Sequence, residues 1–179
     1  SNYGFNDAWR YATIYNPTAP IRDESNPDFE KWGGFYQNVL FDYYNPVAIL
    51  EQNVSDGSDS RVNIAIKGAY EIIDGLTVDA FYSIQAVEEL RNQYYGKESF
   101  WQGADRNGNA RKESRQRWNQ LFETTANWNT DFGRTNFTLL GGYSFQEFWH
   151  EGFFARGGDF ITDFFQYNNM VAAQEFDNG

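Results

Sequence analysis

Four aromatic residues in predicted loops are the best ligand-binding candidates in this sequence. Trp32, Tyr94, Tyr95 and Trp101 stand in segments rich in glycine and polar residues. A sugar ring presents apolar C–H faces, and a flat aromatic side chain offers a large apolar surface against them. The alternative is that these rings pack the loops against each other or against a partner protein. The sequence leaves both roles open.

Patterns for catalysis and for metal binding are weak. His150 is the only histidine, it stands at the end of a predicted strand, and the chain has no cysteine. Asp105-x-Asn107-x-Asn109 resembles the start of a calcium loop, but Ala110 occupies the position where that loop needs glycine. The carboxylates carry no glycosidase signature. We therefore predict no catalytic residue, no metal site and no cofactor, and expect that the chain is not an enzyme.

Composition narrows the class of partner. The net charge of −11 argues against nucleic acid, because binding to phosphates needs a basic face. Aromatic residues make up 20% of the chain, which is typical of the aromatic girdles of membrane barrels or of a carbohydrate-binding surface. The first residues, Ser1 to Gly4, lack the basic and apolar regions of a signal peptide. We therefore expect either a mature chain or a piece of a longer protein.

A long hairpin over residues 115–150 dominates the pattern. Apolar and polar residues alternate on both arms, and this alternation indicates strands because successive side chains point to opposite faces. The arms meet at a short turn, Gly133-Arg134. Trp118 and Trp128 share one face and are ~33 Å apart along a strand. At a tilt of ~40° this spacing rises by about 25 Å, the height of the apolar band of an outer-membrane barrel.

A second hairpin is predicted over residues 61–90, with its turn at Asp74-Gly75. The segments 1–60, 91–114 and 151–179 are expected to be mostly loop. Short turns then lie at one end of the hairpins and long loops at the other. Outer-membrane barrels have this asymmetry, with short periplasmic turns and long extracellular loops.

Three shorter segments carry more local expectations. Residues 55–60 are polar and contain Gly57, so we expect a loop there. Residues 47–52 are predicted to form a short strand. Residues 170–176 fit either a helical turn or a short strand.

These patterns predict an all-β fold, a segment of an antiparallel up-and-down transmembrane β-barrel with about four long strands. Four strands cannot close a barrel, and the edges of an open sheet would expose unpaired backbone groups to hydrocarbon. We therefore expect the chain to be a fragment of a larger barrel. A chain without a run of 18 apolar residues has no spanning helix. The alternative is a soluble secreted β-sandwich that binds carbohydrate, with its aromatic face against a second sheet.

Several local motifs, in their order and spacing, resemble the barrel of SusC/RagA-type TonB-dependent outer-membrane transporters of Bacteroidetes. The resemblance covers nearly the whole chain. The motifs are Asn16-Pro17-Thr18-Ala19-Pro20, Asn45-Pro46-Val47-Ala48, Asp74-Gly75-Leu76, Leu140-Gly141-Gly142-Tyr143-Ser144-Phe145-Gln146 and Phe160-Ile161-Thr162-Asp163.

The resemblance implies a partial barrel domain over 1–179, belonging to a barrel of about 22 strands with a plugged lumen. The resemblance further implies that this chain lacks the plug domain. The family setting implies the outer membrane of a Gram-negative bacterium, contact with its lipid, a SusD-like surface lipoprotein as partner and energy from the TonB complex. The implied cargo is an oligosaccharide or a peptide.

Overall fold

The computed structural model describes residues 3–25, 29–38, 40 and 43–179. The parts of the predicted loop 1–60 at 1–2, 26–28, 39 and 41–42 lie outside the described residues. Two helices come first, α1 (Tyr3–Ile14) and α2 (Pro46–Gln52). Four long strands follow, β1 (Asn53–Ile73), β2 (Leu76–Tyr95), β3 (Asn109–Phe132) and β4 (Thr135–Phe160). The short strand β5 (Ala173–Asn178) comes last, and the 3-10 helices are η1 (Ala104–Arg106), η2 (Gln166–Asn168) and η3 (Met170–Ala172).

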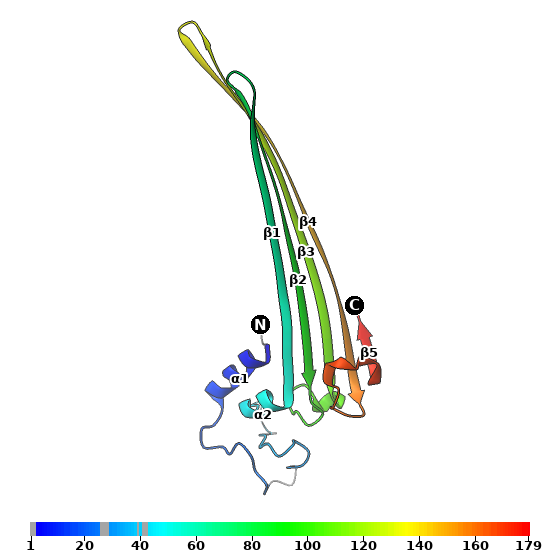
Figure 1. Ribbon diagram of the computed structural model, residues 1–179. Coiled ribbons are helices and arrows are strands. Elements are labelled where there is room, and N and C mark those ends of the chain that lie inside the picture. The colour runs from blue at the N-terminus through cyan, green and yellow to red at the C-terminus, as the bar shows by residue number, and fades with distance from the viewer. Residues whose placement is uncertain (1–2, 26–28, 39, 41–42) are drawn as a thin grey trace. The chain divides into compact units, whose positions relative to one another are not determined.

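The strands form one sheet in the order β1-β2-β3-β4-β5 (Figure 1). β5 pairs antiparallel with the end of β4, from Ala155 opposite Asn178 to Phe160 opposite Ala173. The predicted all-β antiparallel architecture is confirmed, and both short turns lie where they were expected. At the first turn Gly75 has φ of +79°, and a Cβ on this residue would lie 2.0 Å from the Asn129 carbonyl oxygen. Only glycine fits that position without strain.

The strands extend further than the alternation predicted, so the prediction of a loop at 55–60 is wrong. That segment is part of β1 and pairs with the end of β2. A Cβ on Gly57 would lie 2.3 Å from the Leu90 carbonyl oxygen, so glycine here permits close approach of two backbones. Asn92 donates a hydrogen bond to Asp56 at 3.0 Å across the same pair of strands. The sequence of this segment is typical of a loop because it is polar at every position, although its backbone is hydrogen-bonded to β2.

The prediction of a short strand at 47–52 is also wrong, because this segment lies in helix α2. Asn45 caps the helix, and Pro46 follows at the first position, where the missing N–H costs nothing. Helix α1 was not predicted from the sequence. Residues 170–176 contain both predicted alternatives, η3 followed by the start of β5.

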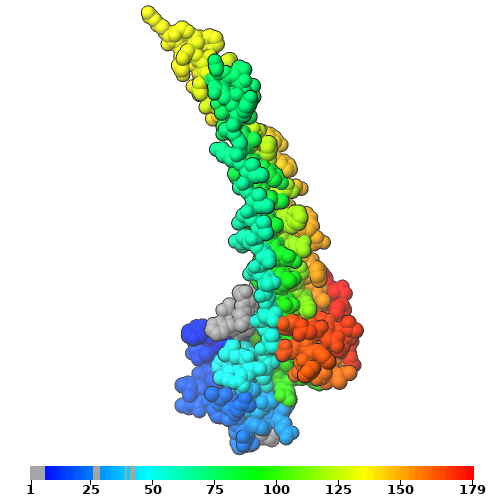
Figure 2. Space-filling model, viewed as in Figure 1, coloured from blue at the N-terminus to red at the C-terminus, as the bar shows by residue number. Residues whose placement is uncertain are grey.

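The chain divides into two compact units. Unit 1 contains 1–58, 90–114 and 152–179, and unit 2 contains 59–89 and 115–151. Within unit 1, the N-terminal and C-terminal segments both contribute to the visible surface (Figure 2). Unit 2 consists of the turn-proximal parts of β1 to β4.

Candidate functional site

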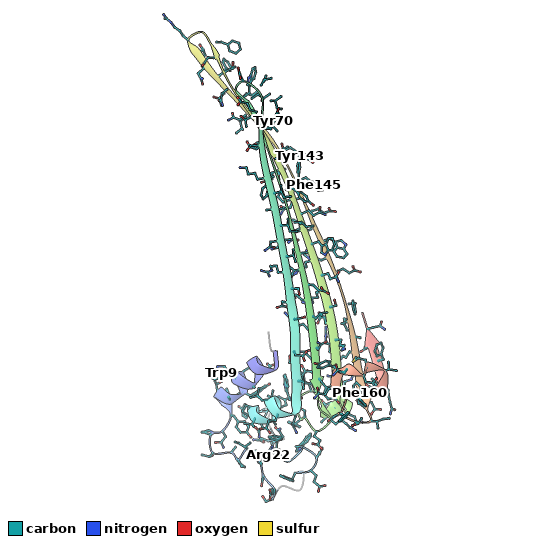
Figure 3. The ribbon with its side chains drawn as sticks, viewed as in Figure 1. Trp9, Arg22, Tyr70, Tyr143, Phe145 and Phe160 are labelled. Carbon is teal, nitrogen blue, oxygen red and sulfur yellow. The ribbon has the colours of Figure 1, made fainter. Side chains whose placement is uncertain are left out.

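One face of the sheet in unit 2 is apolar and exposed. Ile66 is 67% exposed and Tyr70 73% exposed on β1, and Figure 3 labels Tyr70 with Tyr143 and Phe145 of β4. Side chains of this size are normally covered in a folded protein, and a contiguous exposed set marks a surface that contacts a partner or a membrane. The exposed members include Val62, Ile64, Ile66, Tyr70, Ile72, Tyr82, Trp118, Trp128, Leu139, Tyr143, Phe145 and Trp149.

Contacts between neighbouring strands place these residues on the same face. The Tyr82 hydroxyl donates to Gln120 at 3.0 Å, and Gln120 donates to Glu147 at 3.4 Å, which links β2, β3 and β4. The rings of Trp118 and Trp149 lie edge to face, 6.1 Å between centroids. Residues that are opposite one another on adjacent strands share a face. The face is therefore mainly apolar across the strands, and Gln120 and Glu147 form one polar pair on it beside Trp118 and Trp149.

Beyond the Trp118–Trp149 pair polar residues interrupt this face, and exposed Leu90 and Phe153 follow them on β2 and β4. One step further along each strand the same face carries Ser60, Glu88, Gln116 and Glu151. Trp128 stands at the other end, near the turns. An exposed apolar band that meets charged residues beyond a pair of tryptophans is typical of a lipid-facing barrel surface.

The opposite face of unit 2 is mainly polar and internally hydrogen-bonded, with exposed Leu140 and Phe148 as apolar exceptions. Lys67 pairs with Asp79 at 3.9 Å across β1 and β2, and Ser144 donates to Glu123 at 3.4 Å across β3 and β4. Between these pairs, Asn119 donates to Gln85 at 3.1 Å. The predicted segregation of polar from apolar side chains is thus present in the contacts.

Unit 1 holds the four predicted ligand-binding aromatics, and all four are buried. Trp32, Tyr94, Tyr95 and Trp101 are 5, 2, 9 and 7% exposed. Tyr95 and Trp101 pack edge to face at 5.3 Å in a cluster with residues of both helices, whereas Trp32 packs against Phe100 at 4.6 Å. In the structure these rings are therefore packed in the interior of unit 1, and they do not lie together on one surface. Their role in binding a ligand stays a prediction.

Tyr94 belongs to a second cluster, with Ala110 and Phe160. Its hydroxyl donates to Asp163 at 2.6 Å, and the other oxygen of Asp163 accepts from the Lys97 backbone at 3.0 Å. Burial raises the pKa of the Tyr94 hydroxyl, and the hydrogen bond and charge of Asp163 raise it further. These bonds fasten the segment after β4 to the end of β2.

Asp56 and Tyr167 make a second tether for the same segment. The Tyr167 hydroxyl donates to Asp56, and this bond raises the pKa of the hydroxyl above its usual value. The segment that carries η2 is therefore bound at two points to the ends of β1 and β2.

Asn45 organises the segment before α2, and the sequence analysis missed this role. The side chain is 1% exposed and accepts from the Val47 and Ala48 backbone at 3.0 and 3.3 Å. Its amide donates to the carbonyls of Ile21 and Tyr36 at 2.8 and 3.0 Å. The dipeptide Asn45-Pro46 is the signal that could have indicated a helix cap, because asparagine before proline suits the start of a helix.

Two residues of the calcium-like pattern, Asn107 and Asn109, are hydrogen-bonded to side chains of β4. Asn107 donates to Asp159 at 2.7 Å, and Asn109 accepts from Arg156 at 3.0 Å. Within the described ranges, no group of three or more histidine, cysteine, aspartate or glutamate residues is arranged to hold a metal ion. None of the described helices is long and apolar enough to cross a membrane.

Comparison with known proteins adds one relative. TonB-dependent receptor P3 of Formosa agariphila is 32% identical to this chain over 129 residues. The match covers 72% of this chain but only 13% of that receptor, so the chain spans a small part of the relative's length. No family model matches the chain. The similarity supports the family of TonB-dependent receptors.

Proposed function

We propose that this chain forms part of the barrel wall of a TonB-dependent receptor in the bacterial outer membrane. The observation that carries the proposal is the two-faced sheet of unit 2. Its apolar face is exposed, carries tryptophans at two levels and includes one polar pair, Gln120 and Glu147, whereas the opposite face carries paired charges and amides. A strand between lipid and a wet lumen needs this alternation along its length.

The similarity to a TonB-dependent receptor supports the same proposal from an independent direction. Such a receptor draws energy from the TonB complex through segments outside this chain. We propose further that the receptor is of the SusC/RagA type, that it works with a SusD-like surface lipoprotein and that it imports oligosaccharides or peptides. The ordered motifs in loops and turns support this finer assignment.

The alternative of a soluble carbohydrate-binding β-sandwich needs a second sheet over the apolar face. The described part of the chain contains a single sheet. Large residues on the apolar face, such as Ile66 and Tyr143, are exposed. We therefore favour the receptor.

Fractionation of cells that make the native protein tests this proposal. We expect the polypeptide containing these residues in the outer-membrane fraction, resistant to alkaline carbonate and released by detergent. Uptake of its cargo should stop when the TonB complex is inactivated. A detergent-independent soluble species of 20.8 kDa would contradict the proposal.

A further inference from the structure

Two adjoining hollows form a groove on the polar face of unit 2. One has a volume of about 410 Å³ and is lined by Arg61, Arg117 and His150, and the other has a volume of about 360 Å³. The side chains common to both are Gln85, Asn119 and Phe148. The groove therefore crosses all four long strands and is formed entirely by unit 2.

The first hollow carries positive charge in a strongly acidic chain. Arg117 pairs with Glu89. Arg61 is exposed, and no carboxylate in the described part of the chain pairs with its guanidinium. Nearer the turns, the same face carries carboxylates, those of Asp79 and Glu123 among them. A negatively charged ligand is therefore attracted to the arginine end of the face and repelled from the turn end.

The shared wall of the groove offers two further kinds of contact. Phe148 is 60% exposed although it lies among polar residues, so its ring is available to the apolar face of a sugar. The amide oxygen of Asn119 is buried and has no hydrogen-bond donor, while its amide nitrogen is engaged by Gln85. A buried acceptor without a donor costs free energy, and a ligand hydroxyl would satisfy it.

We propose that this groove binds an anionic oligosaccharide. A carboxylate or sulfate group lies between Arg61 and Arg117, the sugar ring packs on Phe148, and a hydroxyl donates to Asn119. Guanidinium groups suit these planar or tetrahedral oxyanions because they donate parallel hydrogen bonds. The inference rests on the proposed function, which makes the polar face a wall of the transport path, and it narrows the cargo to charged sugars.

Calorimetry on the purified full-length receptor in detergent tests the inference. The probes are a galacturonic acid hexasaccharide, a sulfated hexasaccharide and neutral maltohexaose. We expect at least one anionic probe to bind more tightly than maltohexaose, with an affinity that falls as salt is raised. Arg61→Gln should weaken that binding by about tenfold, as the loss of a charge-assisted hydrogen bond does. Phe148→Ala should weaken it by a smaller factor.

Arg134→Gln is the matched control, because Arg134 is an exposed arginine of unit 2 at the second turn, outside the groove. This variant should bind the anionic probe like the unmodified receptor. Equal affinity for neutral and anionic probes, or unchanged binding by Arg61→Gln, would overturn the inference. Tighter binding of hexaglutamate than of either anionic sugar would also overturn it, in favour of an acidic peptide. Each of these results leaves the outer-membrane location intact, whereas a soluble receptor would contradict the proposed function itself.

Discussion

The two units of this chain use aromatic side chains in opposite ways. In unit 1 the rings of Trp32, Tyr94 and Trp101 are buried and packed edge to face against other rings. In unit 2 the rings of Tyr70, Tyr143 and Phe145 are exposed along a continuous face. Unit 1 therefore has its own apolar core. The described residues leave the apolar face of unit 2 exposed, so that face requires an apolar medium or partner to cover it.

Buried polar groups divide the units in the same manner. Asn45, Ser99 and Asn109 are buried in unit 1 and hydrogen-bonded to neighbouring segments. In unit 2, by contrast, the buried residue is apolar: Val87, which lines the groove between Arg61 and Arg117. Substitutions in unit 1 should therefore change stability through packing and hydrogen bonding. In unit 2 the effect of a substitution should depend on whether the side chain faces lipid or water.

The largest effect is expected for Trp101→Ala in unit 1. Removing this buried ring leaves a cavity beside Tyr95 and Ile49, at a cost of about 3–5 kcal/mol to the local free energy of unfolding. Amide hydrogen exchange in the segment 96–108 should become much faster. The matched control is Phe164→Ala, because Phe164 is an exposed ring of the same unit. Equal exchange in the two variants would contradict the packing role of Trp101.

Ile66→Lys tests the apolar face of unit 2. Ile66 lies near the middle of the band between the tryptophan levels, where a lysine facing lipid costs about 2–4 kcal/mol. The amount of folded receptor in the outer membrane, measured by heat-modifiable mobility on gels, should fall. Ala65→Lys places the same charge on the neighbouring residue, whose side chain points to the polar face. That control should assemble normally, and an equal loss in both variants would contradict the assignment of faces.

Asn45→Ala should destabilise the segment before α2 by about 2–3 kcal/mol. The variant loses a helix cap and the hydrogen bonds from the Asn45 amide to the carbonyls of Ile21 and Tyr36, although Ile21 still accepts from the Tyr36 backbone. Limited proteolysis should cut this segment sooner than in the unmodified protein. Asn16→Ala removes an exposed hydrogen bond to Thr18 and should change the rate little. An unchanged rate for Asn45→Ala would show that the cap is dispensable.

The smallest effect concerns Tyr94 and pH. Its pKa is raised above the ordinary value near 10, so the folded state keeps the proton that the unfolded state loses at high pH. The contribution is complete below about pH 10 and decreases as pH rises further. Tyr94→Phe should cost about 1–2 kcal/mol at neutral pH, since it removes the hydrogen bond to Asp163. Denaturation between pH 9 and 11 should show a shallower decline for the variant than for the unmodified protein.

The sequence predicted the sheet because alternation and turn chemistry are local. Asp74-Gly75 and Gly133-Arg134 lie at the turns, and the polar and apolar faces follow from residue parity. The start of β1 was missed because residues 55–60 are paired through the backbone but carry no apolar side chain on either face. Pairing with a distant strand leaves no hydrophobic period to detect.

The candidate ligand residues could not be placed from sequence for a related reason. A tryptophan in a loop has the same local pattern whether it faces solvent or another loop, and burial of Trp32 depends on contact with Phe100, which is remote in the chain. Phe148 was overlooked because it is apolar, like the residues on the other face of β4. Its even position nevertheless places it on the polar face. Parity, rather than residue type, would have identified it.

Fluorescence quenching of paired single-cysteine labels tests most directly whether the apolar face of unit 2 meets lipid. The chain has no cysteine, so labels can be placed at Ile66 and Ala65, and at Tyr143 and Ser144, after any cysteine elsewhere in the receptor has been replaced. In proteoliposomes, labels at Ile66 and Tyr143 should be quenched by lipids brominated in their acyl chains. Labels at Ala65 and Ser144 should be quenched by aqueous iodide instead. Iodide quenching at Ile66 and Tyr143, with no effect of brominated lipid, would contradict the membrane-facing assignment.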